Sequence, residues 1–265
     1  MPRRTRLDAE LVRRGLARSR EHASQLIADG RVTVRGTVAS KSATAVETDA
    51  PVVVREQDGD DWASRGAHKL IGALDAFGID VTGRRALDAG ASTGGFTDVL
   101  LRRGAREVVA ADVGRGLLIW RLQSDERVLV LDKTNVRGLT PEQTQGLVDL
   151  VVADLSFISL RLVLPALLAC ATEDADLLPM VKPQFEVGRE RLGSGGVVRD
   201  PELRADAVRT FIREAETIGL RAHGVTASPL PGPSGNVEYF VWLRRGGPNA
   251  DSDALVDTAV REGPR

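Results

Sequence analysis

Short apolar runs alternate with amphipathic stretches through most of this chain. The apolar runs are rich in Val, Leu and Ala, which is typical of parallel strands buried on both faces. Between them, apolar residues recur every three to four positions, as on one face of a helix. The alternation predicts an α/β fold with a doubly wound, mostly parallel sheet. The seven predicted strands are residues 86–88, 107–112, 128–131, 150–154, 177–181, 221–227 and 237–243.

The N-terminal part follows a different pattern. Its apolar spacing predicts two short helices, the first capped by Asp8 and the second covering residues 19–28. Apolar and polar residues then alternate over 32–38, which predicts a small hairpin, and short strands follow over 45–54. The order helix, helix, hairpin indicates a separate small α+β domain.

Polar, glycine-containing stretches divide the chain further. The loop Gly193–Gly196 is expected to be mobile and to become ordered on binding. The polar C-terminal residues are expected to be loosely held. The predicted organisation is a small domain at 1–58, a linker at 59–63, a large domain at 64–247 and a tail at 248–265.

Charge is distributed unevenly along the chain. Residues 1–41 hold ten Arg or Lys and four Asp or Glu, a net charge of +6, whereas the whole chain of 265 residues carries −1. A basic module ahead of an acidic body predicts a polyanionic partner that the N-terminal end binds.

Cysteine content and hydropathy exclude two classes of protein. The one cysteine, Cys170, cannot form a disulfide framework within the chain, and a reducing cytoplasm is the expected location. The longest apolar run, residues 160–171, is interrupted by Arg161 and Pro165 and is too short to span a bilayer. We therefore expect a cytoplasmic monomer without membrane insertion.

The most informative stretch is a glycine-rich turn between a predicted strand and a predicted helix. The strand ends in Asp88, and glycines at positions 90, 94 and 95 allow the backbone to pass close to a bound ligand. The helix that follows offers unpaired N–H groups at its first turn. This order predicts a nucleoside-type ligand at the turn.

Charged residues lie at the ends of several predicted strands. Asp154 ends the fourth strand, Lys182 follows the fifth, Glu238 begins the seventh, and Lys69 lies in a helix ahead of the first. Ligands of open α/β sheets bind at the carboxyl ends of the strands, so these residues are expected close together. Two lysines and two carboxylates are costly in apolar surroundings unless they pair, which predicts a shared network.

The glycine-rich turn resembles the first motif of class I, Rossmann-like methyltransferases, whose loop wraps the methionyl end of S-adenosylmethionine. By the same resemblance, Asp112 after the second strand is expected at the ribose hydroxyls and Asn135 after the third at the adenine. The expected cofactor-binding residues are Asp88, Gly90, Ser92, Thr93, Gly94, Gly95, Phe96, Asp112, Asn135 and Asp154.

The set Lys69, Asp154, Lys182 and Glu238 resembles the catalytic tetrad of FtsJ-like ribose 2′-O-methyltransferases. The resemblance implies that Lys182 acts as base or alkoxide stabiliser and that Asp154 orients it. The other two residues would fix the ribose. A ribose hydroxyl needs such help because it is a poor nucleophile near neutral pH. A sulfonium methyl donor needs no metal, and no metal-ligand cluster is expected.

The N-terminal pattern resembles the S4 RNA-binding fold, which occurs in a ribosomal protein and in pseudouridine synthases. The resemblance rests on Arg6-Leu-Asp8, Gly15 to Arg20 and Gly30 to Gly36. Its cations are expected to contact RNA phosphates, which makes binding salt-dependent. The expected RNA-binding residues are Arg3, Arg4, Arg6, Arg13, Arg14, Arg18, Arg20 and Lys41.

An S4-like module joined to this tetrad resembles the TlyA family of ribosomal RNA cytidine-2′-O-methyltransferases in its longer, actinobacterial form. The family resemblance implies modification of both 16S and 23S rRNA within ribosomal subunits, and sensitivity to capreomycin-type antibiotics. Asp60 departs from the arginine that relatives carry two residues before Trp62. The matching stretches are 64–70, 88–97, 154–159, 181–186 and 232–239.

Three alternatives remain open at this stage. A base N-methyltransferase carries a tetrapeptide with two prolines where this chain has Asp154-Leu-Ser-Phe157, and it leaves Lys182 and Glu238 unexplained. The second alternative is a non-catalytic RNA-binding or ribosome-assembly factor. The third is a membrane-lytic protein, since family members are often named haemolysins.

Overall fold

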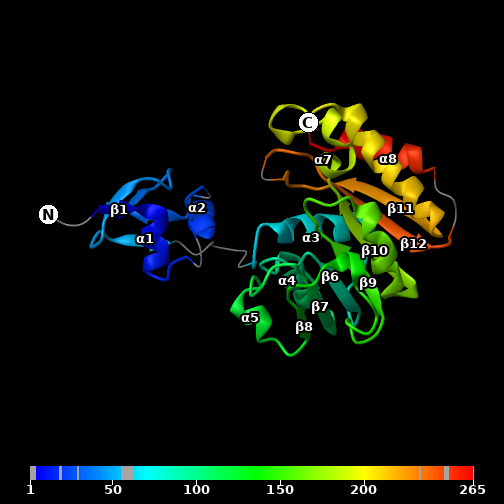
Figure 1. Cartoon of the computed structure of the whole chain (residues 1–265), viewed down its shortest axis with the longest axis horizontal. Coiled ribbons are helices and arrows are strands. Elements are labelled where there is room, and N and C mark those ends of the chain that lie inside the picture. Colours follow the sequence, from blue (N-terminus) through cyan, green and yellow to red (C-terminus); the bar gives the residue numbers. More distant parts are fainter. Residues whose placement is uncertain are drawn as a thin grey trace. The chain divides into compact units, whose positions relative to one another are not determined.

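The computed structural model describes residues 4–17, 20–28, 30–54, 62–232, 234–247 and 251–264. The chain forms two compact units, Met1–Asp61 and Trp62–Arg265 (Figure 1). This division lies at the predicted linker, and the proposed linker residues 59–61 fall outside the described part.

The N-terminal unit contains two helices and five short strands. β1 pairs with β4, and β2 pairs with both β3 and β5, all antiparallel. The structure adds one strand to the prediction, β1, because Arg4–Arg6 finds its partner 39 to 43 positions later along the chain. The elements are β1 Arg4–Arg6, α1 Leu7–Arg13, α2 Arg20–Ala28, β2 Val32–Val34, β3 Thr37–Val38, β4 Ala45–Glu47 and β5 Val52–Val54.

Asp8 has a different role from the predicted helix cap. Helix α1 begins at Leu7, two residues earlier than a cap at Asp8 predicts, and Arg6 occupies the cap position. The Asp8 carboxylate is buried and accepts hydrogen bonds from Arg6 and Arg20. These ion pairs hold the pKa of Asp8 well below its usual range, because the Arg6 guanidinium stabilises the charged form. The predicted cap therefore serves to join α1 to α2.

The C-terminal unit is built around one seven-stranded sheet with the order β11-β12-β10-β9-β6-β7-β8. Five neighbouring strands run parallel, whereas β12 is antiparallel to both β10 and β11. All seven predicted strands are confirmed, with ends shifted by at most two residues except in β10, which begins six residues before the predicted strand. The strands are β6 Arg85–Ala89, β7 Glu107–Ala111, β8 Val128–Leu131, β9 Val148–Ala153, β10 Ala171–Val181, β11 Leu220–Ala227 and β12 Tyr239–Arg245.

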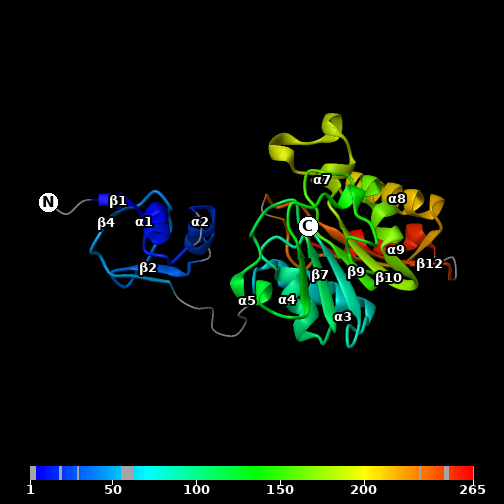
Figure 2. The same cartoon turned by 60° about the horizontal axis from the view of Figure 1, so that its bottom comes forward.

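Helices cover both faces of this sheet, as the apolar strand composition requires (Figures 1 and 2). In β9, Leu150 and Val152 belong to the core that contains residues of α3 and α4, whereas Val151 belongs to the core that contains residues of α6, α8 and α9. The helices of the unit are α3 Gly66–Phe77, α4 Gly95–Arg102, α5 Trp120–Gln123, α6 Leu164–Ala169, α7 Pro183–Glu186, α8 Pro201–Thr217 and α9 Ser252–Glu262.

The expectation of a loosely held C-terminal tail is wrong for residues 252–262. They form α9, which packs against β11 and α8 and buries Val256 and Ala259. The Asp251 side chain caps this helix by accepting a hydrogen bond from the Ala254 N–H. An apolar spacing of three to four residues was present in the sequence, but the polar residues between obscured it.

Candidate active site

The carboxyl ends of the parallel strands form one edge of the large sheet. Asp88 lies near the end of β6, and Asp112, Asp154 and Lys182 directly follow β7, β9 and β10. The antiparallel register pairs Val181 with Tyr239, so the residue before β12 reaches the same edge. The pairing of the strands thus brings these residues, which are far apart in the sequence, to one edge of the sheet.

Lys182 and Asp154 form one ion pair at this edge. The Lys182 Nζ lies 2.6 Å from Asp154 Oδ1 and donates a hydrogen bond of 2.9 Å to Ser156 Oγ. Lys182 is only 8% exposed, whereas Asp154 is partly open to solvent. A buried ammonium group is therefore held in place with its partner facing outward.

Lys69 and Glu238 form a second ion pair. The Lys69 Nζ lies 2.5 Å from Glu238 Oε2, and the glutamate is 2% exposed. The opposite carboxylate oxygen packs against Gly232, where a Cβ atom would lie 2.7 Å from Oε1. The predicted network consequently consists of two lysine–carboxylate pairs, one from α3 and the start of β12 and one from the ends of β9 and β10.

Glycines in the turn after β6 are required by the protein's own backbone. Gly90 has φ +90°, and a Cβ there would overlap with the carbonyl oxygen of Asp154. Gly94 has φ +101°, and a Cβ on Gly95 would overlap with the Ser64 hydroxyl. The turn therefore sits close to the beginning of α3 and to the sheet edge that bears the four residues expected to form the tetrad, termed the catalytic edge after that expectation.

Asp88 is fully buried under this turn. The Thr97 hydroxyl donates to Oδ2 at 2.7 Å, whereas Oδ1 is buried and has no hydrogen-bond partner among the described residues. Burial, together with the nearby charges of Asp154 and Asp112, raises the pKa of Asp88 to about 7, although the Thr97 hydrogen bond favours the charged form. An unsatisfied buried carboxylate oxygen suits a site that receives a cationic group.

Asp112 and Asn135 both fix loops at the neighbouring strand ends. The Asp112 carboxylate accepts hydrogen bonds from Ser92 N–H at 2.8 Å and from Gly114 N–H at 2.7 Å. Each oxygen retains a further lone pair for a ligand hydroxyl. The Asn135 side chain is exposed and caps a 3₁₀ turn by accepting from Arg137 N–H at 3.0 Å.

The other expected cofactor residues have mixed roles. Ser92 has φ +48° and directs its N–H to Asp112, and the Thr93 hydroxyl donates to the Ala63 carbonyl at 3.4 Å. Phe96 is buried, with its ring centroid 6.0 Å from that of Phe240. Phe96 therefore belongs to the hydrophobic core, and only its backbone can face a ligand.

Sequence reasoning did not assign a role to Phe157. This residue is 92% exposed and has φ +65°, and its ring centroid lies 5.3 Å from that of Phe185. It directly follows Ser156 and lies three positions after Asp154, so an aromatic face is available beside this edge of the sheet. The signal in the sequence was an aromatic residue three positions after a strand-end acid.

Trp62 and Ala63 connect the start of the C-terminal unit to the helix that follows the glycine-rich turn. The Arg102 guanidinium lies 4.3 Å from the Trp62 ring centre, and the Ala63 N–H donates to the buried Asp98 carboxylate at 2.9 Å. Both partners belong to α4. The Trp62 side chain thus docks on its own unit.

The predicted RNA-binding cations of the N-terminal unit differ in exposure. Arg13 is 58% exposed, whereas Arg14 is 20% exposed and donates to the carbonyls of Thr48 and Ala50. Both arginines also bind the buried Glu10 and lower its pKa to about 2, with the Arg13 hydrogen bond as the main cause. The remaining described cations of the set are exposed: Arg4, Arg6, Arg20 and Lys41. Arg3 and Arg18, like Asp60, lie outside the described residues.

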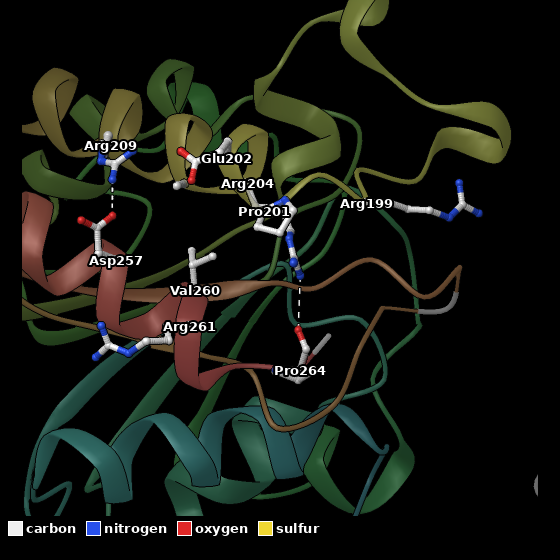
Figure 3. Close-up of a pocket in the computed structure, with 10 residues that line it drawn as sticks. Arg199, Pro201, Glu202, Arg204, Arg209, Asp257, Val260, Arg261 and Pro264 are labelled. Atoms are coloured by element: carbon white, nitrogen blue, oxygen red, sulfur yellow. Dashed lines mark hydrogen bonds and ion pairs between the residues drawn. The ribbon is translucent and has the colours of Figure 1, made fainter.

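A cavity of about 680 Å³ lies elsewhere, between α8 and α9 (Figure 3). The buried Arg204 extends into it and donates to the Pro264 carbonyl, and Arg209 pairs with Asp257 across it. None of the four tetrad residues lines this cavity. It is therefore separate from the catalytic edge.

Two features are absent from the described residues. These residues contain no cluster of three or more histidine, cysteine or acidic side chains arranged to hold a metal ion. Among the helices described, none combines the length and the apolar character that crossing a membrane requires.

Comparison with known proteins places this geometry among RNA-modifying enzymes. The FtsJ-like methyltransferase family matches residues 62–245, and the S4 domain family matches residues 5–52. A 16S/23S rRNA (cytidine-2′-O)-methyltransferase TlyA from Mycobacterium tuberculosis is 60% identical over 268 residues, which covers 100% of both chains. A 23S rRNA (cytidine-2′-O)-methyltransferase TlyA from Campylobacter jejuni is 34% identical over 182 residues, 68% of this chain and 70% of the relative.

A solved structure shares both units. It is of a provisionally named hemolysin from Streptococcus thermophilus, is 34% identical, and covers 99% of this chain and 97% of its own, with a TM-score of 0.77. The expected fold, a Rossmann-like methyltransferase sheet with a small S4-like unit ahead of it, is confirmed by these matches and by the observed strand order.

Proposed function

Because this chain belongs to the FtsJ-like methyltransferases, within the TlyA family that carries an S4 domain, we propose that it methylates the ribose 2′-hydroxyl of cytidines in 16S and 23S rRNA. The observation that carries the proposal is the Lys182–Asp154 pair at 2.6 Å, beside the glycine-rich turn. A base methyltransferase or a non-catalytic RNA-binding protein has no need for this buried ammonium group at the sheet edge.

The tetrad supplies the chemistry at the ribose. S-adenosylmethionine supplies an electrophilic methyl group when bound. Lys182 is held as an ion pair by Asp154, and this favours stabilisation of the developing 2′-alkoxide over proton abstraction by the lysine. The 2′-proton leaves through the partly exposed Asp154 to solvent. The Lys69–Glu238 pair holds the far side of the ribose.

The glycine-rich turn and the neighbouring strand ends form the proposed cofactor site. The unsatisfied Oδ1 of Asp88 provides negative charge under the sulfonium end. Asp112 has lone pairs left for the ribose hydroxyls, and the exposed Asn135 lies at the end of the next strand, for the adenine. The residues present therefore fit S-adenosylmethionine, and its position agrees with the rule for open α/β sheets.

The N-terminal unit is proposed to bind rRNA within ribosomal subunits. Its exposed cations would contact phosphates, and S4-type recognition of folded RNA relies on shape more than on base edges. We propose the domain limits 1–58 for the binding part and 64–247 for the catalytic part, onto which α9 packs. A monomer is proposed as the working state. Loss of the methyl groups is proposed to reduce susceptibility to capreomycin-type antibiotics.

Phe157 is proposed to receive the target base. A ribose inside folded RNA reaches a recessed lysine only if its nucleotide leaves the stack. The exposed Phe157 ring beside Asp154 offers the stacking surface that such a base needs, at about 1–3 kcal/mol per base. The base then stacks away from the methyl donor, and the hydroxyl faces Lys182.

The deciding experiment uses purified 30S and 50S subunits from cells without this gene. They are incubated with the protein and S-adenosylmethionine that carries a labelled methyl group, and the rRNA is digested to nucleosides. We expect label in 2′-O-methylcytidine from both subunits. Label in a base-methylated nucleoside would support the base methyltransferase instead. No label, with binding intact, would support the non-catalytic alternative.

A further inference from the structure

Asn236 is buried beside the catalytic edge and no step of the reaction uses it. It is 3% exposed and lies two residues before Glu238. Both ends of its amide group are engaged: the Val198 N–H donates to Asn236 Oδ1 at 2.9 Å, and Asn236 Nδ2 donates to the Gly196 carbonyl at 3.1 Å. A side-chain amide thus binds both a donor and an acceptor of a distant backbone.

The segment that it binds belongs to a projecting loop, residues 188–199, which we term the glycine arm. The glycine arm extends from the C-terminal unit between α7 and α8 (Figure 2). Its second half contains Gly195 and Gly196, which have positive φ values of +76° and +72°. At its base Val187 and Val198 pack with Ala207 of α8. The loop that sequence analysis expected to be mobile is therefore anchored at both its base and Gly196.

The same glycine arm is continuous with Lys182. Lys182 is followed directly by α7, and Val187 closes that helix with a hydrogen bond from its N–H to the Pro183 carbonyl. The chain then enters the arm. Holding the arm at Val198 therefore restrains the short helix that follows the catalytic lysine.

On the other side, Asn236 is continuous with Glu238. The Asn236 carbonyl accepts from Gly232 N–H at 2.9 Å, which closes the loop that packs on the Glu238 carboxylate. The Glu238 carbonyl in turn accepts from Ser228 N–H at 2.8 Å. These backbone bonds hold Gly232 and Asn236 together ahead of β12, and the Asn236 amide joins them to the arm.

We infer that Asn236 is a positioning residue, whose amide joins the loop after Lys182 to the loop before Glu238 and so sets the separation of the two ion pairs that receive the ribose. The inference rests on the proposed function. Strands β10 and β12 pair as far as Val181 and Tyr239, where the backbone pairing between them ends. Lys182 and Glu238 lie one residue beyond that point. A displacement of about 1 Å at a reacting group costs up to about 10²-fold in rate.

The test compares Asn236→Ala and Asn236→Asp with a control at the opposite edge of the sheet, Thr144→Val. Thr144 is also buried, and its hydroxyl donates to the Gly146 carbonyl at 2.8 Å near the first residue of β6. Asn236→Asp keeps the acceptor for Val198 and places a carboxylate oxygen opposite the Gly196 carbonyl. Single-turnover methylation, the Kd values for RNA and S-adenosylmethionine, and trypsin cleavage at Arg191 and Arg199 are measured for each variant.

We expect Asn236→Ala to slow the single-turnover step by at least about 10-fold, with both Kd values within about 2-fold of wild type. The single-turnover rate of Asn236→Asp is expected to lie between those of Asn236→Ala and wild type. Trypsin is expected to cut the glycine arm faster in both variants. A freed arm with an unchanged rate, or a loss equal to that of Thr144→Val at matched thermal stability, would overturn the inference. If wild-type protein transfers no methyl group, the proposed function fails. The trypsin result then still shows whether the Asn236 amide holds the glycine arm.

Discussion

Lys69 and Glu238 lie 169 positions apart in the sequence, and their Nζ and Oε2 atoms are 2.5 Å apart in the structure. The lysine comes from α3, ahead of the first strand of the large sheet, and the glutamate precedes its last strand. Because the glutamate is almost fully buried, the pair exists only when the whole sheet has formed. The catalytic edge is therefore sensitive to the folding of the entire C-terminal unit.

Removing one member of this pair is expected to be more harmful than removing both. Glu238→Gln leaves the Lys69 ammonium group recessed without a carboxylate, which costs about 3–5 kcal/mol in comparable buried pairs. The double variant Lys69→Met, Glu238→Gln removes the charges together and is expected to regain part of that stability. Urea unfolding checks this, and additive losses in a double-mutant cycle would show that the pair is not coupled.

Both variants are expected to lose methyl transfer, because neither retains the pair that holds the ribose. Recovery of stability in the double variant without recovery of activity would separate the two roles of the pair. A double variant with wild-type methylation would contradict the proposed role of Lys69 and Glu238 at the ribose.

Replacement of Lys182 is expected to affect the chemical step alone. Lys182→Met removes the positive charge that Asp154 holds beside the alkoxide and is expected to slow single-turnover methylation by about 10²–10⁴-fold. Binding of S-adenosylmethionine and RNA is expected to remain near wild type, since the glycine-rich turn and the N-terminal cations are unchanged. Calorimetry and filter binding measure both. A Lys182→Met protein that methylates normally would refute the mechanism.

Two glycines with similar backbone angles provide a matched test of the cofactor turn. Gly90 has φ +90° and Gly83 has φ +72°, but only a Cβ at Gly90 meets an atom of the protein, the Asp154 carbonyl. Gly83→Ala is expected to cost about 1 kcal/mol through backbone strain and to bind S-adenosylmethionine normally. Gly90→Ala is expected to abolish cofactor binding, because either the turn or Asp154 must move. Equal cofactor affinity in the two variants would contradict this interpretation.

Asp88 predicts a specific pH dependence of stability. Its pKa of about 7 lies above the ordinary value of 3.8, so the folded protein keeps a proton that the unfolded chain has lost between these pH values. The free energy of unfolding is therefore expected to fall as pH rises, by up to about 1.4 kcal/mol per pH unit, and to level off above pH 7. Asp88→Asn lacks this proton equilibrium. The difference in the free energy of unfolding between wild type and Asp88→Asn, measured with urea from pH 5 to 8, isolates the contribution of Asp88 protonation.

The same residue predicts proton release on cofactor binding. A cationic sulfonium group favours the charged carboxylate, so binding near pH 6 is expected to release a proton from Asp88. Calorimetry in two buffers with different ionisation enthalpies measures the release. Identical proton release by Asp88→Asn would assign it to another group.

Arg13 and Arg14 offer a matched pair in the N-terminal unit. Both bind Glu10, but Arg14 also donates to two backbone carbonyls and is much less exposed. Arg13→Gln is expected to weaken rRNA binding and to reduce the salt dependence by about one phosphate contact, with little loss of stability. Arg14→Gln is expected to lower the melting temperature of the unit. Similar melting temperatures for both variants, with equal losses of RNA affinity, would assign both arginines to phosphate binding.

Some features follow from local sequence and were predicted correctly. The seven strands could be predicted because Val-, Leu- and Ala-rich runs between amphipathic stretches have few alternatives in a doubly wound fold. The glycine-rich turn was identifiable because the order strand, glycine turn, helix is a local pattern. The charged residues at the strand ends could be located in the same way, whereas their role as a catalytic tetrad came from the family resemblance and stays a prediction.

Other features depended on partners that no local pattern names. Asp8 looked like a helix cap, but contacts with Arg6 and Arg20 made it a buried ion-pair centre. The C-terminal segment looked like a loose tail until β11 and α8 provided a surface for Val256 and Ala259. Arg13 and Arg14 are adjacent in sequence, and only the carbonyls of Thr48 and Ala50 distinguish them.

The sequence by itself determined the elements, their order and the residue types at the strand ends, because hydrophobic periodicity and glycine spacing are local properties of the chain. Only the tertiary structure decided how the tetrad divides, Lys182 with Asp154 and Lys69 with Glu238, and that the amide of Asn236 joins the glycine arm to the loop before Glu238. The physical reason is that these contacts need partners brought within hydrogen-bond distance by sheet register and helix packing, which no spacing along the chain specifies.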